Sequence, residues 1–157
     1  MKKTVLFMVT ALLTLSLHAV PGIRISVGAS RNFALSHSSG YLADGASVFL
    51  ESSFGTRACT FVASGSFTTA QDIDVAETSL ALRREAPVDE ALSLFIESGA
   101  GIRFVTEHGA DASLICHGGV RYTLTGNMEL CALAGIRAFA SGAVGFDASV
   151  AGTYRFS

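Results

Sequence analysis

The carboxyl-terminal segment of the chain, 146–157, alternates between an apolar row and a mostly polar row of residues. Phe146, Val150 and Tyr154 belong to the apolar row, and Asp147 and Arg155 to the polar row. Successive side chains on a β-strand point to opposite faces, so this pattern predicts a strand with one apolar and one polar face. The rest of the chain must supply sheet partners for that strand.

The composition indicates how such a sheet is placed. Hydrophobic residues make up 50% of the chain and charged residues only 15%, and the mean hydropathy is +0.48. These values are typical of a membrane protein, yet no run of about 18 apolar residues follows the amino-terminal segment. A closed sheet can still span a bilayer, because all of its backbone groups pair between strands. On composition alone, a soluble sandwich or a lipid-carrying barrel stays open as an alternative.

The amino terminus has the organisation of a secretory signal peptide. It reads Met-Lys-Lys, runs almost without polarity from Thr4 to Leu17, and then reaches a small residue, Ala19. A basic head, a short apolar core and a small residue at the cleavage site are the parts of such a signal. We therefore expect a signal peptide at 1–19, cleaved after Ala19, and a β-barrel domain at 20–157.

The net charge after this cleavage argues against a nucleic-acid partner. The signal peptide contains Lys2 and Lys3, which are the only lysines of the chain. The mature protein then has 9 Arg against 13 Asp and Glu, a net charge of −4. A nucleic-acid-binding domain is expected to be basic, so the sequence predicts no nucleic acid among the partners.

Eight alternating segments follow the signal peptide. They are predicted at Ile23–Phe33, Ala46–Phe54, Ala58–Thr68, Val75–Arg83, Leu92–Phe104, Ala112–Leu124, Met128–Phe139 and Phe146–Ser157. Polar loops are predicted at 36–45, 69–74 and 106–111, and a turn around Pro87. An even number of strands leaves no sheet edge unpaired if the sheet closes. The sequence thus predicts an all-β fold, an eight-stranded antiparallel up-and-down transmembrane barrel with both termini on the periplasmic side.

The charged residues of these segments fall on the rows opposite the apolar ones. If the apolar rows face lipid, the charged rows face a lumen that has room for little more than its own side chains. Arginine bonds carboxylates bidentately, so a nearly neutral network can fill such a lumen. The predicted lumen-lining residues are Arg24, Glu51, Glu77, Arg83, Glu97, Arg103, His117, Arg121, Glu129, Arg137, Asp147 and Arg155.

Aromatic residues and cysteines give two further expectations. The cysteines, Cys59, Cys116 and Cys131, lie within predicted strands, and Cys116 and Cys131 point to opposite faces, so we expect free thiols. Aromatic side chains fall near predicted strand ends, as membrane-interface girdles require, although phenylalanine also favours strands in general. The candidates are Phe33, Phe67, Phe104, Phe139 and Phe146 at the outer rim, and Phe54, Tyr122, Tyr154 and Phe156 at the inner rim.

The signal peptide, the eight amphipathic strands, the inward charges and the terminal Val150–Phe156 segment together resemble a known family. This is the family of small eight-stranded outer-membrane β-barrel proteins of double-membraned bacteria, the OmpX, OmpW and OmpA-barrel group. The resemblance implies outer-membrane localisation and outer-membrane lipids as partners. It also implies that the barrel-assembly machinery reads an assembly signal made of Val150, Gly152, Tyr154 and Phe156, here followed by Ser157.

The expected function is that of an integral, surface-exposed structural barrel with a narrow, filled lumen. We expect no metal-binding residue, because no pair among His37, His108 and His117 has metal-ligand spacing on one strand. We expect no enzymatic activity, cofactor or catalytic residue either, because the Ser and His residues of 37–39 and 108–113 do not have the spacing of a known catalytic arrangement. A host or surface ligand is not specified by the sequence. The alternatives are a porin-like conduit for small solutes, a soluble periplasmic lipid- or ligand-binding barrel, and a lipid A-modifying enzyme.

Overall fold

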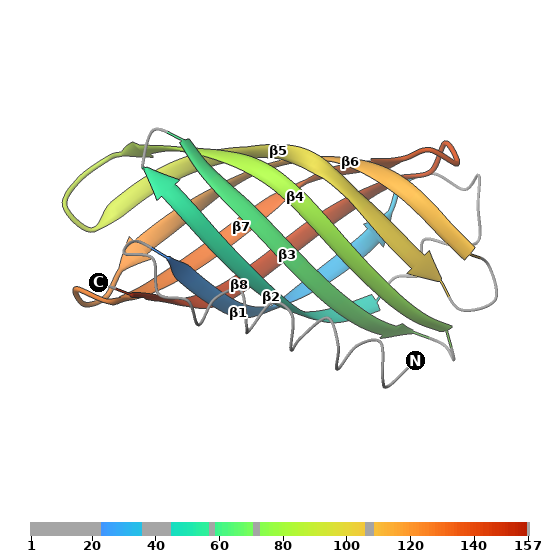
Figure 1. Ribbon diagram of the computed structural model, residues 1–157, viewed down its shortest axis with the longest axis horizontal. Helices are drawn as coiled ribbons and strands as arrows, with labels where there is room; N and C mark the ends of the chain where they lie inside the picture. The colour runs from blue at the N-terminus through green and yellow to red at the C-terminus, as the bar shows by residue number, and fades with distance from the viewer. Residues whose placement is uncertain (1–22, 36–44, 57–58, 71–72, 106–108, 157) are drawn as a thin grey trace.

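The computed structural model describes residues 23–35, 45–56, 59–70, 73–105 and 109–156. Eight strands form one closed antiparallel barrel, so the predicted fold class is confirmed (Figure 1). The predicted signal peptide lies outside the described residues. The strands are β1 (Arg24–Ala34), β2 (Gly45–Thr56), β3 (Cys59–Ala70), β4 (Ile73–Pro87), β5 (Leu92–Val105), β6 (Gly109–Thr123), β7 (Met128–Phe139) and β8 (Val144–Arg155).

The sheet closes because β8 returns to pair with β1. Each strand is hydrogen-bonded to its neighbour in sequence, and the final ladder runs antiparallel from Arg24, which faces Arg155, to Ala34, which faces Gly145. The strands cross the long axis of the barrel obliquely, as closure of a sheet requires (Figure 1). Among the residues that the structure describes, no helix has the length and apolarity needed to cross a membrane.

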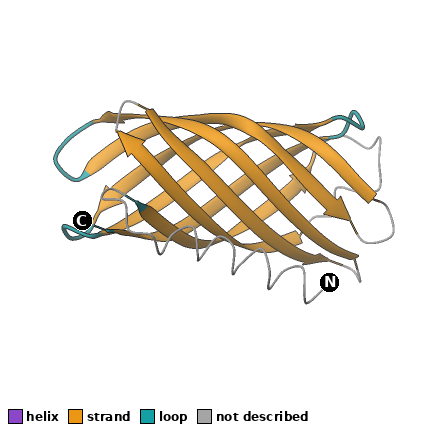
Figure 2. Cartoon of the chain, in the orientation of Figure 1, coloured by secondary structure: helices purple, strands orange, loops and turns teal. Residues whose placement is uncertain are grey.

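The barrel has two ends, which we name by what they carry. The terminal end is where β1 begins and β8 ends, and it also carries the turns 88–91 and 124–127 (Figure 2). The loop end is the opposite one, with the turn 140–143 and the connections between β1 and β2, β3 and β4, and β5 and β6.

Several strands are longer than the sequence predicts. β4 continues past its predicted end at Arg83 to Pro87, which stands opposite Ser93 on β5. β6 already begins at Gly109, and Ala70 of β3 pairs with Ile73 of β4, so the predicted polar loops at 106–111 and 69–74 are shorter than expected. A ladder needs only backbone groups, so it can continue through polar residues that suggest a loop. The bounds of β7 agree with the prediction.

The apolar rows face outward, so the outer surface of the described wall is apolar. Leu80 is 70% exposed, Ile96 67% and Val150 63%, whereas Arg83, Glu97 and other charged side chains of the opposite rows are buried. The interior also contains small clusters of apolar side chains, and one of them consists of Phe95, Cys131 and Ala151. This polarity is the reverse of that of a water-soluble domain, whose apolar side chains are mostly inside. The three cysteines are free, as predicted.

Glycines make room for the rings that point into the barrel. A Cβ atom on Gly28 would come within 2.7 Å of Phe49 Cζ, and one on Gly135 within 2.5 Å of His117 Cδ2. Real Cβ contacts are longer than this, so each ring can lie against the neighbouring strand only where that strand has no side chain. The glycines thus allow bulky groups to enter a narrow interior.

Candidate functional site

Arg83 is the centre of the charged interior. β4 points this side chain inward, where it is fully buried. Its Nη1 and Nη2 donate to the two oxygens of Glu51 at 2.8 and 2.9 Å, and its Nε and Nη2 donate to Glu97 Oε2 at 2.9 and 2.6 Å. The planar fork of arginine fits two carboxylates in this way, and its charge offsets part of the cost of burying them.

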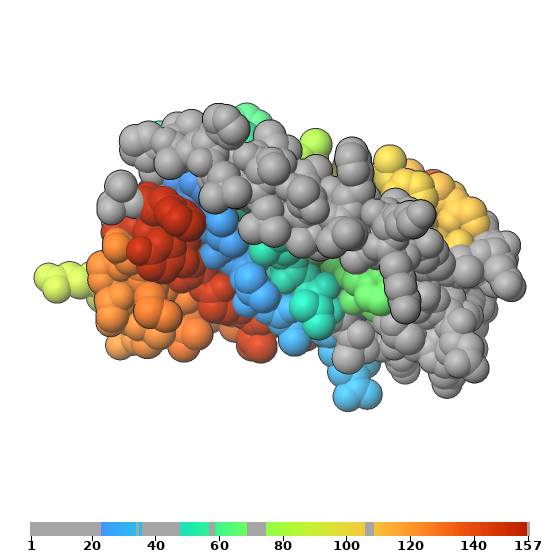
Figure 3. Space-filling view, turned by 60° about the horizontal axis from the view of Figure 1, so that its bottom comes forward, coloured from blue at the N-terminus to red at the C-terminus, as the bar shows by residue number. Residues whose placement is uncertain are grey.

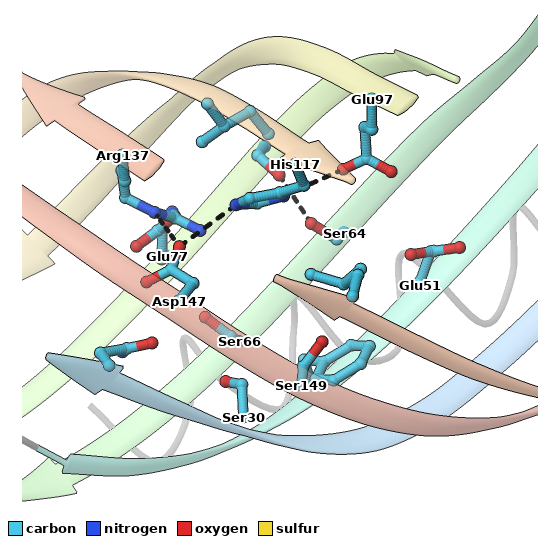
Figure 4. A pocket seen from close by; sticks show the side chains of 15 residues that line it. Ser30, Glu51, Ser64, Ser66, Glu77, Glu97, His117, Arg137, Asp147 and Ser149 are labelled. Carbon is cyan, nitrogen blue, oxygen red and sulfur yellow. Dashed lines mark hydrogen bonds and ion pairs between the residues drawn. The ribbon is translucent and has the colours of Figure 1, made fainter. Parts of the chain in front are cut away.

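The contacts continue from Glu97 across the lumen. Nδ1 of His117 lies 3.6 Å from Glu97 Oε1, and its Nε2 lies 3.4 Å from Asp147 Oδ2. The same Asp147 oxygen accepts a hydrogen bond of 2.8 Å from Arg137 Nε (Figure 4). His117 therefore bridges two carboxylates that come from β5 and β8.

A further pair of contacts extends the chain of charges toward the loop end. Arg137 pairs with Glu77, whose Oε2 also accepts a 3.2 Å hydrogen bond from Arg103 Nε. The Arg103 guanidinium lies over the ring of Phe139, 4.1 Å from its centroid. We call the connected set the central network: Glu51, Arg83, Glu97, His117, Asp147, Arg137, Glu77 and Arg103.

A second group of charges, the terminal cluster, lies at the terminal end and consists of Arg24, Glu85, Arg121 and Glu129. Arg24 lies 3.4 Å from Glu129 and 3.9 Å from Glu85. Arg121 pairs with both acids, at 3.3 Å with Glu129. Two cations thus face two anions, and each contacts both partners of opposite charge.

Phe95 connects the central network with the terminal cluster. Its ring centroid is 4.5 Å from the Arg83 guanidinium carbon and 5.7 Å from that of Arg121. An aromatic face attracts cations through its quadrupole, and the attraction strengthens where water is excluded. The buried ring therefore separates two like charges while it attracts both.

The interior charges nearly cancel. The terminal cluster is neutral, and the central network sets three arginines against four carboxylates, with His117 between two of the acids. Only Nε2 of His117 lies within hydrogen-bonding distance of an acid, Asp147, but a ring that carried a proton on both nitrogens would supply a fourth positive charge between Glu97 and Asp147. The arrangement has the stoichiometry of a neutral network.

The structure distributes the predicted lumen residues between these two groups, with one difference. Arg155 is partly exposed and donates from Nη2 to the carbonyl oxygen of Gly126 at 2.8 Å, so it joins the 124–127 turn at the mouth of the barrel. Its position at the end of β8 explains this, because the turn lies within reach of the long side chain there. All four residues of the predicted assembly signal are exposed, namely Val150, Gly152, Tyr154 and Phe156.

Sequence reasoning missed Glu85 and misplaced Phe139. The Glu85 side chain is only 3% exposed and pairs with two arginines, but it lies beyond the predicted end of β4. Glu85 lies two residues after Arg83, so continued alternation along β4 would have placed it on the same inward face. Phe139 was expected at the outer aromatic rim, yet it is 7% exposed and points inward, because it lies on the same row of β7 as Cys131 and Arg137. The Arg103 guanidinium lies over its ring there.

A small polar cavity lies beside the central network. Its volume is about 60 Å³, and serines form much of its lining, as Ser30, Ser64, Ser66 and Ser149 show in Figure 4. A cavity needs about 10–15 Å³ of such volume to hold one water, so this cavity has room for a few water molecules. The described residues contain no cluster of three or more His, Cys, Asp or Glu side chains that could hold a metal ion.

Comparison with known proteins finds similarity in structure but not in sequence. No protein-family model matches the chain, and no curated protein matches it either. The solved structure of neisserial surface protein A (NspA) superposes with a TM-score of 0.72 at 13% identity, covering 85% of this chain and 97% of that one. The attachment invasion locus protein Ail of Yersinia pestis gives 0.62 at 17% identity, covering 87% and 100%. The outer membrane enzyme PagL gives 0.54 at 11% identity, covering 85% and 99%.

These similarities define the fold of the chain. It is that of the small eight-stranded outer-membrane β-barrels, and it extends over nearly the whole length of NspA and Ail. The predicted resemblance to this group is confirmed at the level of architecture. At such low identity the shared fold carries no activity, ligand or partner from one protein to another.

Proposed function

We propose that the chain is an integral outer-membrane β-barrel protein whose lumen is filled by its own charged side chains. In this role it is a structural, surface-exposed protein of a double-membraned bacterium rather than an open pore. The observation that carries the proposal is the reversed polarity of the wall, apolar outside and charged inside.

The outward face supports insertion into a bilayer. The outward residues of β4 to β6 include Leu80, Ile96 and Leu114, all at least 67% exposed. A soluble monomer rarely leaves apolar patches of this extent in water, whereas hydrocarbon accommodates them. The strands have 11 to 15 residues, enough for the roughly 9 to 11 that cross a membrane at a tilt.

The interior supports a closed lumen. The two groups reach from Arg24, the first residue of β1, to Arg103, near the end of β5, and the cavity beside the central network has room for only a few waters. A porin-like conduit would need this network to part, and a soluble carrier of lipids would need an apolar pocket where the charges lie. Outer-membrane lipids are the proposed partners of the apolar outer wall. The barrel-assembly machinery is the proposed partner of the assembly signal, Val150, Gly152, Tyr154 and Phe156.

The proposal includes no catalytic role. His117 is engaged by Glu97 and Asp147 inside the barrel, away from the surface where a lipid substrate would lie. His37 and His108, which the sequence analysis considered, lie outside the described residues. If the chain nevertheless modifies lipid A, its expression would change the mass of lipid A in the host cell.

Four measurements test the proposal. Expressed in a double-membraned bacterium, the protein should fractionate with outer membranes and migrate faster on a gel before heating than after. Proteolysis of intact cells should cut within 36–45, the predicted loop at the loop end. In planar bilayers the purified barrel should give no steady single-channel conductance. Recovery in the soluble periplasmic fraction would overturn membrane insertion, and stable conductance would overturn the filled lumen.

A further inference from the structure

An apolar groove lies on the outer wall of the barrel where β6, β7, β8 and β1 run side by side. Its volume is about 380 Å³, within the range of about 300–1000 Å³ usual for small-molecule sites. The lining includes Val27, Val120, Leu130 and Val150, with Tyr122 toward the terminal end. Figure 3 shows β1 in blue and β8 in red as neighbours on one face of the molecule.

The groove exists because Gly152 interrupts an otherwise apolar row of β8. Gly152 stands between Val27 of β1 and Leu130 of β7, and a Cβ atom added to it would meet nothing within 4 Å. At most other glycines within the strands, an added Cβ atom would meet an aromatic ring or the backbone of the neighbouring strand. Here the missing side chain leaves an open trough between the flanking side chains of its neighbours.

The two ends of the groove differ in character. Tyr122 stands opposite Leu92, the first residue of β5, and Tyr154 stands opposite Met128, the first residue of β7, so both tyrosines lie near the terminal end. Tyrosine rings prefer the headgroup level of a membrane because they combine an apolar body with a polar tip. Val120 and Val150 lie farther along the strands, toward the middle of the wall.

We propose that this groove binds one acyl chain of a glycerophospholipid from the leaflet at the terminal end of the barrel. The chain lies over Gly152 between Val27 and Leu130, and the headgroup lies at the level of the tyrosines. The inference rests on the proposed membrane insertion and adds a fixed lipid position to it.

A second copy of the barrel fits the groove less well than a lipid chain. A barrel wall is convex, and a two-fold contact would place groove against groove and leave both troughs unfilled. A flexible hydrocarbon chain can follow a narrow trough and contact both of its sides. Such contacts are individually weak but add up along the chain.

The experiment fills the groove and counts the lipid. Gly152→Leu places a side chain in the trough, and Ala132→Leu fills the same groove from β7. Gly118→Leu is the matched control, because Gly118 is also an exposed strand glycine with room for a Cβ atom, whose nearest neighbour would be Phe95 O at 3.9 Å. Each purified barrel is refolded without assembly machinery into bilayers of phosphatidylethanolamine and phosphatidylglycerol and released for native mass spectrometry.

We expect the wild type and Gly118→Leu to retain one phospholipid each, and the two groove variants to retain about fivefold less, equivalent to roughly 1 kcal/mol of lost contacts. Equal retention by all folded variants would overturn the lipid site while leaving membrane insertion intact. A wild-type dimer that Gly152→Leu converts to a monomer would assign the groove to a second copy instead. Failure of the wild type to insert and to shift on a gel would overturn the proposed function itself.

Discussion

Replacement of Arg83 by methionine should strongly destabilise the barrel. The side chain is fully buried, and four hydrogen bonds of 2.6–2.9 Å join it to Glu51 and Glu97. Methionine has a similar length but no charge, so Arg83→Met leaves two buried carboxylates without their shared cation. It also removes the cation from the face of Phe95.

The expected magnitude follows from the cost of an unpaired buried charge. Removing one partner of a buried ion pair costs about 3–5 kcal/mol, which lowers the ratio of folded to unfolded protein by roughly 200- to 5000-fold. Restoring neutrality should recover most of this loss. We therefore expect the triple variant Arg83→Met, Glu51→Gln, Glu97→Gln to be more stable than Arg83→Met alone.

The assay is reversible urea unfolding in lipid vesicles, followed by far-ultraviolet circular dichroism and by the gel shift between folded and unfolded barrel. Arg84→Met is the control, since Arg84 is the next residue of β4 but is exposed on the outer wall. Its unfolding midpoint should stay close to that of the wild type. If Arg83→Met and Arg84→Met unfold at the same urea concentration, or if the triple variant is the least stable, the account of the network is wrong.

Two other substitutions test the wall and its packing. Gly135→Ala should cost about 1–3 kcal/mol, because the new Cβ atom would clash with the backbone carbonyl oxygen of Cys116 and would lie 2.5 Å from Cδ2 of the His117 ring. Gly118→Ala should be nearly neutral, and equal stabilities in urea would contradict this packing. Leu80→Arg, in the middle of β4, should cost about 2–4 kcal/mol in vesicles if the outer wall faces lipid, and an unchanged midpoint would argue for a wall in water.

The alternation of side chains was enough to predict the barrel and most of its interior. Segment 128–139 shows why: Glu129, Cys131 and Arg137 alternate with Leu130 and Ile136, so the pattern sets both the strand and its faces. A shift of one residue would reverse every side chain, which makes the register of such a strand strongly determined.

The ends of strands were less predictable, and Glu85 shows the reason. Two adjacent arginines, Arg83 and Arg84, place a charge on each face, so the contrast between apolar and polar rows disappears just before Pro87. The sequence therefore indicates a turn where the backbone ladder in fact continues to Pro87. Arg84 can stay exposed on the outer wall because it lies near the terminal end, where a long cationic side chain reaches the membrane interface.

The pairing of the interior charges could not be predicted from alternation at all. Arg83 on β4 meets Glu51 on β2, and Asp147 on β8 meets His117 on β6, although neither pair lies on adjacent strands. Such contacts depend on the stagger between strands and on the width of the lumen, which the faces of single strands do not specify. The inward rows predict which residues are available, and the closed barrel decides which of them meet.

The central claim, that the apolar row faces lipid and the charged row does not, can be tested at two neighbouring residues of β5. The chain contains no tryptophan, so Phe95→Trp and Ile96→Trp each create a single fluorescent reporter, one inside the barrel and one on its outer wall. In bilayers of phospholipids brominated along the acyl chain, the account predicts strong quenching of Trp fluorescence in Ile96→Trp and little in Phe95→Trp. Equal quenching in both variants, or the reverse order, would contradict it.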